Sequence, residues 1–166
     1  MSEAVIGFGS NQGDKGDNLL RALQAVSRLP GVKVTGISSI YDSRPEGASG
    51  EQENYYNMCV KVEVGMSPMA LLGACLGIEA ALGRVRSARN APRVIDLDLL
   101  LYEGVKSESF EMSLPHPRLL QRAFVLLPLK ELYPSGRAPG IFFGPHIAEV
   151  DTSGIRRLER RISMEK

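Results

Sequence analysis

The sequence predicts an α+β fold, namely a ferredoxin-like β-α-β-β-α-β sandwich with additional C-terminal elements. Strand-like and helix-like apolar patterns follow one another in that order along the chain, and each is bounded by turn or capping residues. The chain has 166 residues, of which 43% are apolar, and no linker or low-complexity tract divides it. We therefore expect a single domain over residues 1–166 with one sizeable core.

The first half of the chain contains a strand, a helix and a second strand. Residues 4–8 form an apolar run that ends at a Gly-Ser-Asn turn, which predicts a buried strand. A helix is expected next, with Asp17 as its N-cap, an apolar stripe (Leu20, Leu23, Val26, Leu29) and a stop at Pro30-Gly31. Residues 32–41 are rich in β-branched residues and predict a strand, and the polar residues 42–54 predict a long loop.

The second half repeats this pattern and then departs from it. Residues 57–64 alternate, so a half-buried strand antiparallel to its predecessor is expected, with Met58, Val60, Val62 and Val64 on one face. Ser67-Pro68 begins a helix that ends near Gly83, and residues 94–102 predict the next strand. A further helix is expected over 119–132, and residues 154–166 read as a basic, solvated C-terminal tail.

Composition excludes several classes of function. Twenty Lys and Arg oppose nineteen Asp and Glu, so no overall field attracts nucleic acid or a membrane surface, and neither is expected as a partner. No apolar run reaches membrane-spanning length, and the predicted location is cytoplasmic. Cys59 and Cys75 lack metal-ligand spacing and are expected to be buried, reduced thiols. A monomer is favoured.

Asp96 and Asp98 are the most informative pair of side chains. They lie two positions apart in a predicted strand, so both point to the same side with Cα atoms roughly 6.5 to 7 Å apart. A solvated strand face could also carry them, but Leu97 and Leu99 beside them indicate a buried strand. Since like charges repel and burial of a carboxylate is costly, the pair indicates a site for a hard cation such as Mg²⁺.

Arginines precede this pair in a polar loop. Arg84, Arg86, Arg89 and Arg93 lie within ten residues of one another and supply forked donors that stay charged at any accessible pH. Taken singly, each could belong to an ordinary solvated loop. Beside two carboxylates, the cluster predicts the binding of a magnesium-bound polyphosphate.

Two further motifs are weaker signals. His116 lies between Pro115 and Pro117, which restrict the backbone and fix the direction of the histidine. Tyr55 and Asn57 place an aromatic face beside a carboxamide, a combination suited to a flat heterocycle that carries donors and acceptors. Each motif alone is also typical of an ordinary turn or strand start.

Seven motifs follow one another along the chain: Gly9-Ser10-Asn11, Tyr41-x-Ser43-x-Pro45-x-Gly47, Tyr55-x-Asn57, Glu79-x-x-Leu82-Gly83-Arg84-x-Arg86, Arg89-x-Ala91-Pro92-Arg93-x-x-Asp96-Leu97-Asp98, Pro115-His116-Pro117 and Arg122-x-Phe124. In this order they resemble the 6-hydroxymethyl-7,8-dihydropterin pyrophosphokinase family of folate biosynthesis. The resemblance covers residues 5–134, and it departs at Asn90-Ala91, where family members commonly have Trp-Gly.

The resemblance implies transfer of pyrophosphate from ATP to the hydroxymethyl group of 6-hydroxymethyl-7,8-dihydropterin, with release of AMP. It implies two Mg²⁺ ions held by Asp96 and Asp98, and catalytic roles for these two residues together with Arg84 and Arg93. The ATP-binding residues it implies are Glu79, Arg84, Arg86, Arg89, Arg93, His116 and Arg122. The pterin-binding residues it implies are Ser43, Pro45, Gly47, Tyr55, Asn57 and Phe124.

Two alternatives remain open on the sequence alone. Another Mg-dependent phosphoryl or nucleotidyl transferase could use the same aspartates and arginines without an aromatic pocket. A nucleotide-binding module with weakened catalysis could retain the binding residues alone. Formation of AMP rather than ADP from ATP and the pterin distinguishes the three hypotheses.

Overall fold

The computed structural model of the chain describes residues 1–44, 53–83, 93–160 and 162. Its main strands are β1 (Ser2–Ser10), β2 (Val32–Ile37), β3 (Tyr41–Ser43), β4 (Tyr55–Val64), β5 (Asp96–Tyr102) and β10 (Ile155–Arg157). The α-helices are α1 (Lys15–Ser27), α2 (Pro68–Ala81) and α3 (Ala123–Leu132). Two small hairpins, β6 (Ser107–Glu108) with β7 (Ser113–Leu114) and β8 (Arg137–Ala138) with β9 (Ile141–Phe142), and the 3₁₀ helices η1 (Leu119–Gln121) and η2 (Gly144–Glu149) complete it.

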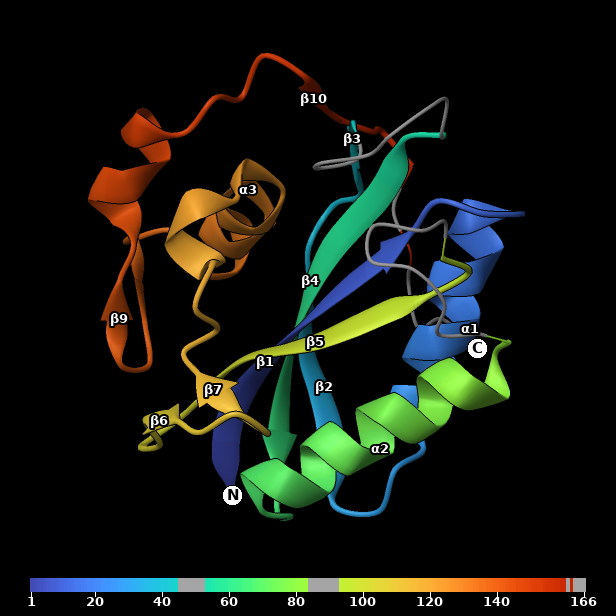
Figure 1. Cartoon of the computed structure of the whole chain (residues 1–166), viewed down its shortest axis with the longest axis vertical. Coiled ribbons are helices and arrows are strands. Elements are labelled where there is room, and N and C mark those ends of the chain that lie inside the picture. Colours follow the sequence, from blue (N-terminus) through green and yellow to red (C-terminus); the bar gives the residue numbers. More distant parts are fainter. Residues whose placement is uncertain (45–52, 84–92, 161, 163–166) are drawn as a thin grey trace.

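The main strands form one antiparallel sheet in the order β10-β3-β4-β1-β5, and β2 also pairs with β4 (Figure 1). The long strand β4 therefore pairs with β1 along one edge and with β2 and then β3 along the other. With β2 and β3 taken as one interrupted strand, this is the strand order of a ferredoxin-like sandwich. The predicted fold class is confirmed.

The predicted strand over residues 32–41 is interrupted between β2 and β3. Ser38 N–H donates to the Cys59 carbonyl at 3.0 Å, and the Ser38 hydroxyl accepts from Cys59 N–H at 2.9 Å. A side chain thus takes the place of a ladder carbonyl, so the chain bends away from β4 and returns as β3. Sequence composition does not reveal this exchange, because serine is common in strands and in turns alike.

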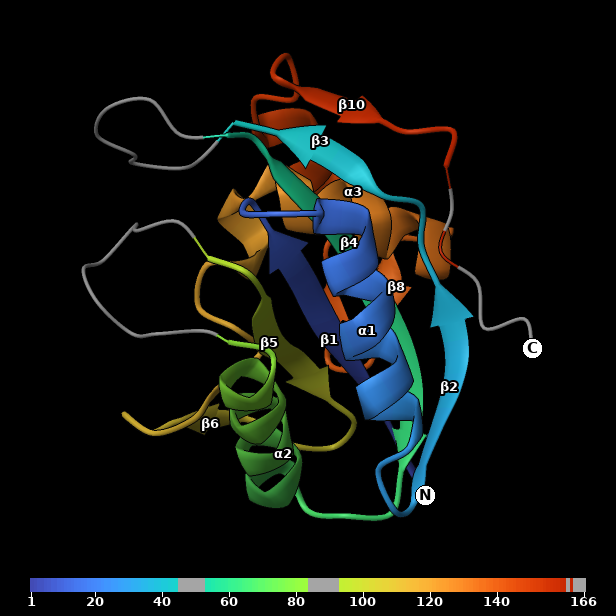
Figure 2. The same ribbon diagram turned by 90° about the vertical axis from the view of Figure 1, so that its right-hand side faces the viewer.

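Helices cover both faces of the sheet (Figure 2). The first core lies under α1 and α2 and contains Leu23, Cys75 and the predicted β4 stripe from Met58 to Val64. The second core lies under α3 and contains Val5, Cys59 and Leu126. Because β1 lies inside the sheet and is buried on both faces, residues 4–8 form a continuous apolar run, and β5 is likewise apolar from Leu99 to Tyr102. Both cysteines are buried free thiols, as predicted.

Helix starts agree with the sequence at α2 and differ at α1 and α3. Ser67 caps α2 as expected, but α1 begins earlier than predicted, because the Asp14 carboxylate accepts from Asp17 N–H at 3.0 Å. Asp17 lies in the first turn and is not the cap. The expected helix over 119–132 is divided into η1 and α3 by the extended backbone of Arg122.

The C-terminal segment is not the solvated tail that the sequence predicted. Residues of β10 pair with β3, and Leu158 N–H donates to the Ile40 carbonyl at 2.8 Å. Ile162 is buried in the first core. Without β10, β3 would be an edge strand with unpaired backbone groups. No helix within the described ranges has the length and apolar character needed to cross a membrane.

The position of the α1 cap predicts which aspartate stabilises the helix. Asp14→Ala removes the acceptor for Asp17 N–H and should lower the free energy of unfolding by about 1 kcal/mol. Asp17→Asn leaves the Asp14 carboxylate and the backbone N–H of residue 17 in place, so it should cost less stability. Urea denaturation of the two variants measures the difference, and an equal or larger loss in the Asp17 variant would contradict the observed cap.

Candidate active site

The register of three strands places the candidate site residues in two rows. Gly9 of β1 lies opposite Asn57 of β4 on one side and Asp96 of β5 on the other. Two residues earlier, Gly7 lies opposite Cys59 and Asp98 in the same way. Directly opposed residues in an antiparallel ladder point to the same face. The Asn57 amide of β4 and the two carboxylates of β5 therefore lie on either side of Gly7 and Gly9, which form the floor of the site.

The two glycines leave room for a cavity at this point of the sheet. Gly7, Gly9, Asn57, Asp96 and Asp98 all line one pocket. An ideal Cβ at Gly9 would lie 2.9 Å from the Asn57 side-chain oxygen, so any other residue would displace the amide. Sequence reasoning did not identify these glycines as functional. The available signal was glycine at alternate positions of a buried apolar strand, which often marks the close approach of a ligand.

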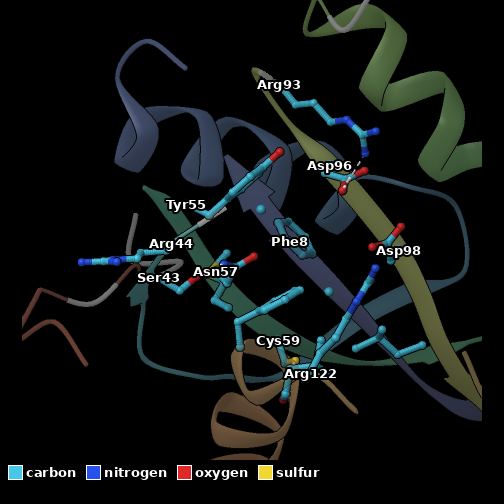
Figure 3. Close-up of a pocket in the computed structure, with 16 residues that line it drawn as sticks. Phe8, Ser43, Arg44, Tyr55, Asn57, Cys59, Arg93, Asp96, Asp98 and Arg122 are labelled. Carbon is cyan, nitrogen blue, oxygen red and sulfur yellow. Dashed lines mark hydrogen bonds and ion pairs between the residues drawn. The ribbon is translucent and has the colours of Figure 1, made fainter. Parts of the chain in front are cut away.

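Asp96 and Asp98 face the same cavity, as their spacing predicted (Figure 3). The Arg93 guanidinium donates to Asp96 Oδ2 at 3.3 Å. Arg93 is itself anchored, because its backbone N–H donates to Asn11 Oδ1 at 2.8 Å and its carbonyl accepts from Asn11 N–H at 3.1 Å. Among the described residues, no cluster of three or more His, Cys, Asp or Glu side chains could hold a metal ion.

The opposite side of this pocket is aromatic and polar. Tyr55 of β4 and Phe124 in the first turn of α3 line it from two different layers. Asn57 Nδ2 donates to the buried Ser43 hydroxyl at 3.1 Å, which fixes the orientation of the amide. The Arg122 guanidinium lies over the Phe124 ring at 5.4 Å from its centroid, and the arginine side chain extends toward Asp98 in Figure 3.

A second cavity reaches the same aspartates from the side of α2. It is lined by Glu79, His116 and the apolar side chains Leu72 and Phe110, and it shares Arg93, Asp96 and Asp98 with the first pocket. One cavity is thus aromatic with an amide edge, and the other carries a histidine and a glutamate. The aspartate pair stands where the two cavities meet.

Glu79 has a structural task in addition to lining the second cavity. Its carboxylate is buried and accepts from Leu97 N–H at 2.7 Å. Leu97 lies between the two aspartates, so this bond holds the start of β5 in place. Burial and the charges of Glu79 and Asp98 raise the pKa of the Cys75 thiol to about 12, and burial also raises the pKa of Cys59. Neither thiol can therefore supply a thiolate nucleophile near neutral pH.

His116 is held as a neutral imidazole. Its Nδ1 accepts from Arg118 N–H at 3.2 Å, an arrangement that places the ring proton on Nε2. Burial lowers the pKa of His116, and the nearby charges of Arg122 and Arg118 lower it further, against an opposing contribution from Asp96. The ring therefore serves the second cavity as a hydrogen-bond donor and not as a cation.

The structure gathers most of the residues that the sequence singled out. Ser43, Tyr55, Asn57, Phe124 and Arg122 line the first cavity with Arg93 and the aspartates, and Glu79 and His116 line the second. Pro45, Gly47, Arg84, Arg86 and Arg89 lie outside the described residues. Sequence reasoning did not identify Arg44 and Cys59, which also line the first cavity.

Comparison with known proteins identifies the family. The family model described as "7,8-dihydro-6-hydroxymethylpterin-pyrophosphokinase (HPPK)" matches residues 5–134. The chain belongs to this family. It is 42% identical over 159 residues to a 2-amino-4-hydroxy-6-hydroxymethyldihydropteridine pyrophosphokinase of Methylorubrum extorquens, covering 96% of this chain and 100% of that protein. The Bacillus subtilis protein of the same name is 34% identical over 163 residues, covering 98% and 94%.

The fold of HPPK is also found among solved structures. A crystal structure of an HPPK-DHPS chain in complex with substrates superposes with a TM-score of 0.67 at 13% identity. That superposition covers 89% of this chain and 43% of the HPPK-DHPS chain. At this level of identity the likeness concerns the fold, and it agrees with the ferredoxin-like arrangement described above.

The close contact at Gly9 predicts that the pocket floor cannot take a side chain. In Gly9→Ala, the new methyl group would collide with the Asn57 amide and lower the free energy of unfolding by roughly 1 to 3 kcal/mol. The matched control is Gly77→Ala on α2, where an added Cβ meets nothing within 4 Å and helix propensity should rise. Urea unfolding tests this pair, and a Gly9 variant as stable as the wild type would argue against the close approach of Asn57 to the floor.

The environment of His116 predicts its titration. In the ligand-free protein its midpoint should lie below the value of about 6.5 that is usual for histidine, so protonation occurs only as the pH falls below that value. NMR titration of the ring protons measures this midpoint, with His116→Gln used to assign the signals. A midpoint above 6.5 would show that Asp96 dominates over burial and the arginines.

Proposed function

We propose that this HPPK-family chain transfers the pyrophosphoryl group of ATP to the hydroxymethyl oxygen of 6-hydroxymethyl-7,8-dihydropterin and releases AMP. The observation that carries the proposal is the meeting of two chemically different cavities at Asp96 and Asp98. A transferase must hold two substrates so that their reacting atoms meet, and that alignment accounts for much of the rate enhancement. The family and the names of its relatives supply the identity of the reaction.

Asp96 and Asp98 would hold magnesium, with two ions proposed. The donor set fits, because two carboxylates on a rigid strand are what Mg²⁺ takes from a protein when substrate phosphates and water complete its octahedron. When bound, the metal would neutralise charge on the triphosphate as the bond between the α and β phosphates breaks.

The second cavity is proposed to receive ATP. Arg93, anchored through Asn11, would contact the phosphates with a fixed charge, and His116 would add a neutral Nε2 donor. Arg122 would approach from the other side of the aspartates, and Arg84, Arg86 and Arg89 are proposed from the sequence to complete the phosphate contacts. Glu79 would act through the placement of β5. The contribution of these groups is positioning and electrostatic stabilisation.

The first cavity is proposed to receive the pterin. Tyr55 and Phe124 would supply aromatic faces, and the Asn57 amide, oriented by Ser43, would pair with the polar edge of the ring. Pro45 and Gly47 are proposed from the sequence to contribute to the same site. This pocket distinguishes the proposal from a general Mg-dependent phosphoryl or nucleotidyl transferase, which would have no use for it.

Removal of either carboxylate tests the proposal. Asp96→Asn and Asp98→Asn should each reduce formation of AMP from ATP and the pterin by about 100-fold or more, because the charge on the triphosphate is then left unbalanced. Pterin binding, measured by calorimetry, should change little. The control is Glu63→Gln. It alters an exposed carboxylate near the end of β4, whereas the pocket residues Tyr55 and Asn57 lie at the start of that strand. Release of ADP by the wild-type protein, or near-normal turnover of both Asp variants, would refute the proposal.

A further inference from the structure

The carboxylate of Glu131 connects α3 to the region between β2 and β3. Glu131 lies in the last turn of α3, and its Oε1 accepts from both the backbone N–H and the hydroxyl of Ser39, each at 3.0 Å. Its Oε2 accepts from the Tyr41 hydroxyl. One side chain of the helix thus receives three hydrogen bonds, two from Ser39 just before β3 and one from Tyr41, the first residue of β3.

The two elements that Glu131 joins carry opposite sides of the first cavity. The first turn of α3 contributes Phe124, and Arg122 precedes it. The strand side contributes Ser43 of β3 and Tyr55 of β4, which are paired with each other in the ladder. Tyr41 is paired with Asn57 two residues further along, so the tyrosine held by Glu131 stands directly beside the amide of the pocket.

Just beyond α3, the Tyr133 hydroxyl donates to the Glu3 carboxylate of β1 at 2.6 Å, but this bond lies away from both cavities. The other contacts between α3 and the sheet are mainly apolar packing around Val125, Leu126 and Leu129, with a weak bond from the Cys59 thiol to the Val125 carbonyl at 3.8 Å. Apolar packing is non-directional, whereas hydrogen bonds to a carboxylate are strong and directional and so add a defined orientation to the contact. Burial and the neighbouring Glu131 raise the pKa of Tyr41, so its hydroxyl keeps the proton that it donates.

We propose that Glu131 is a positioning residue that fixes the separation between the α3 side and the β3–β4 side of the first cavity. It does not line either cavity. A flat ring bound between two faces requires a defined spacing, so loss of the Glu131 bonds should weaken pterin binding. The second cavity is bounded by α2, β5 and the His116 segment, none of which Glu131 contacts through these bonds. The inference rests on the proposed assignment of the first cavity to the pterin.

The test compares two substitutions at one position. Glu131→Ala should raise the KM for the pterin by roughly tenfold, the equivalent of about one net hydrogen bond, and leave the KM for ATP and kcat within about twofold. Glu131→Gln should restore most of the pterin affinity, because its amide oxygen can accept from Ser39 and its NH₂ can donate to the Tyr41 oxygen. Lys130→Ala alters the adjacent residue of α3, whose ammonium is exposed, and should match the wild type.

The outcomes separate the inference from the function on which it rests. No AMP formation by the wild-type protein would refute the proposed function. An active wild type with an unchanged pterin KM in Glu131→Ala, or with equal losses for pterin and ATP, would overturn the positioning role. Kinetics are measured where circular dichroism shows each variant folded. If Glu131→Ala does not fold, Tyr41→Phe removes a single hydroxyl and should still raise the pterin KM alone, and an unchanged value overturns the inference.

Discussion

The register of β1 between β4 and β5 is the constraint on which the site depends. Gly9 aligns Asn57 with Asp96, and Gly7 aligns Cys59 with Asp98, on one face of the sheet. A slip of one residue would carry the glycines to the face covered by α1 and α2 and would place Phe8 in the pocket floor. The difference in side-chain size opposes such a slip, since Phe8 fills the first core and the position of Gly9 leaves no room for a Cβ beside the Asn57 amide.

Polar contacts inside this frame orient particular groups. The Glu79 carboxylate holds Leu97 N–H between the two aspartates, Ser43 orients the Asn57 amide, and the Asn11 side chain anchors Arg93. Each is a bond from a side chain to a neighbouring strand or loop, and each involves a buried or partly buried group. A buried polar group that loses its hydrogen-bond partner is costly in free energy, so these contacts favour one arrangement of the site.

Much of this arrangement follows from periodicity in the sequence. The spacing of Asp96 and Asp98 predicted a shared face because side chains alternate along a strand, and the stripe along β4 was predicted for the same reason.

Features for which neighbouring residues are equally suited were harder to predict. Asp14 and Asp17 both suit a helix start, and only the fold decides between them. The sequence also predicted a solvated tail, because three residues of β10 are too few to produce a pattern. The roles of Gly7, Gly9 and Glu131 depend on contacts between segments far apart in the chain. Until Ser39 and Tyr41 are placed, Glu131 is simply one of two charged residues near the end of its helix. Family resemblance supplied the identity of Phe124 as a candidate ligand-binding residue, whereas local pattern alone would assign it to the core.

In the proposed reaction, two substrates enter from separate cavities and meet at the aspartate pair. The most direct measurement is a crystal structure of the ternary complex with Mg²⁺, a nonhydrolysable ATP analogue and 6-hydroxymethylpterin. We expect the pterin against Tyr55 and Phe124, the nucleotide beside Glu79 and His116, and the phosphates bridged to Asp96 and Asp98 through the metal. Both ligands in one cavity, or phosphates bound away from the aspartates, would contradict this arrangement.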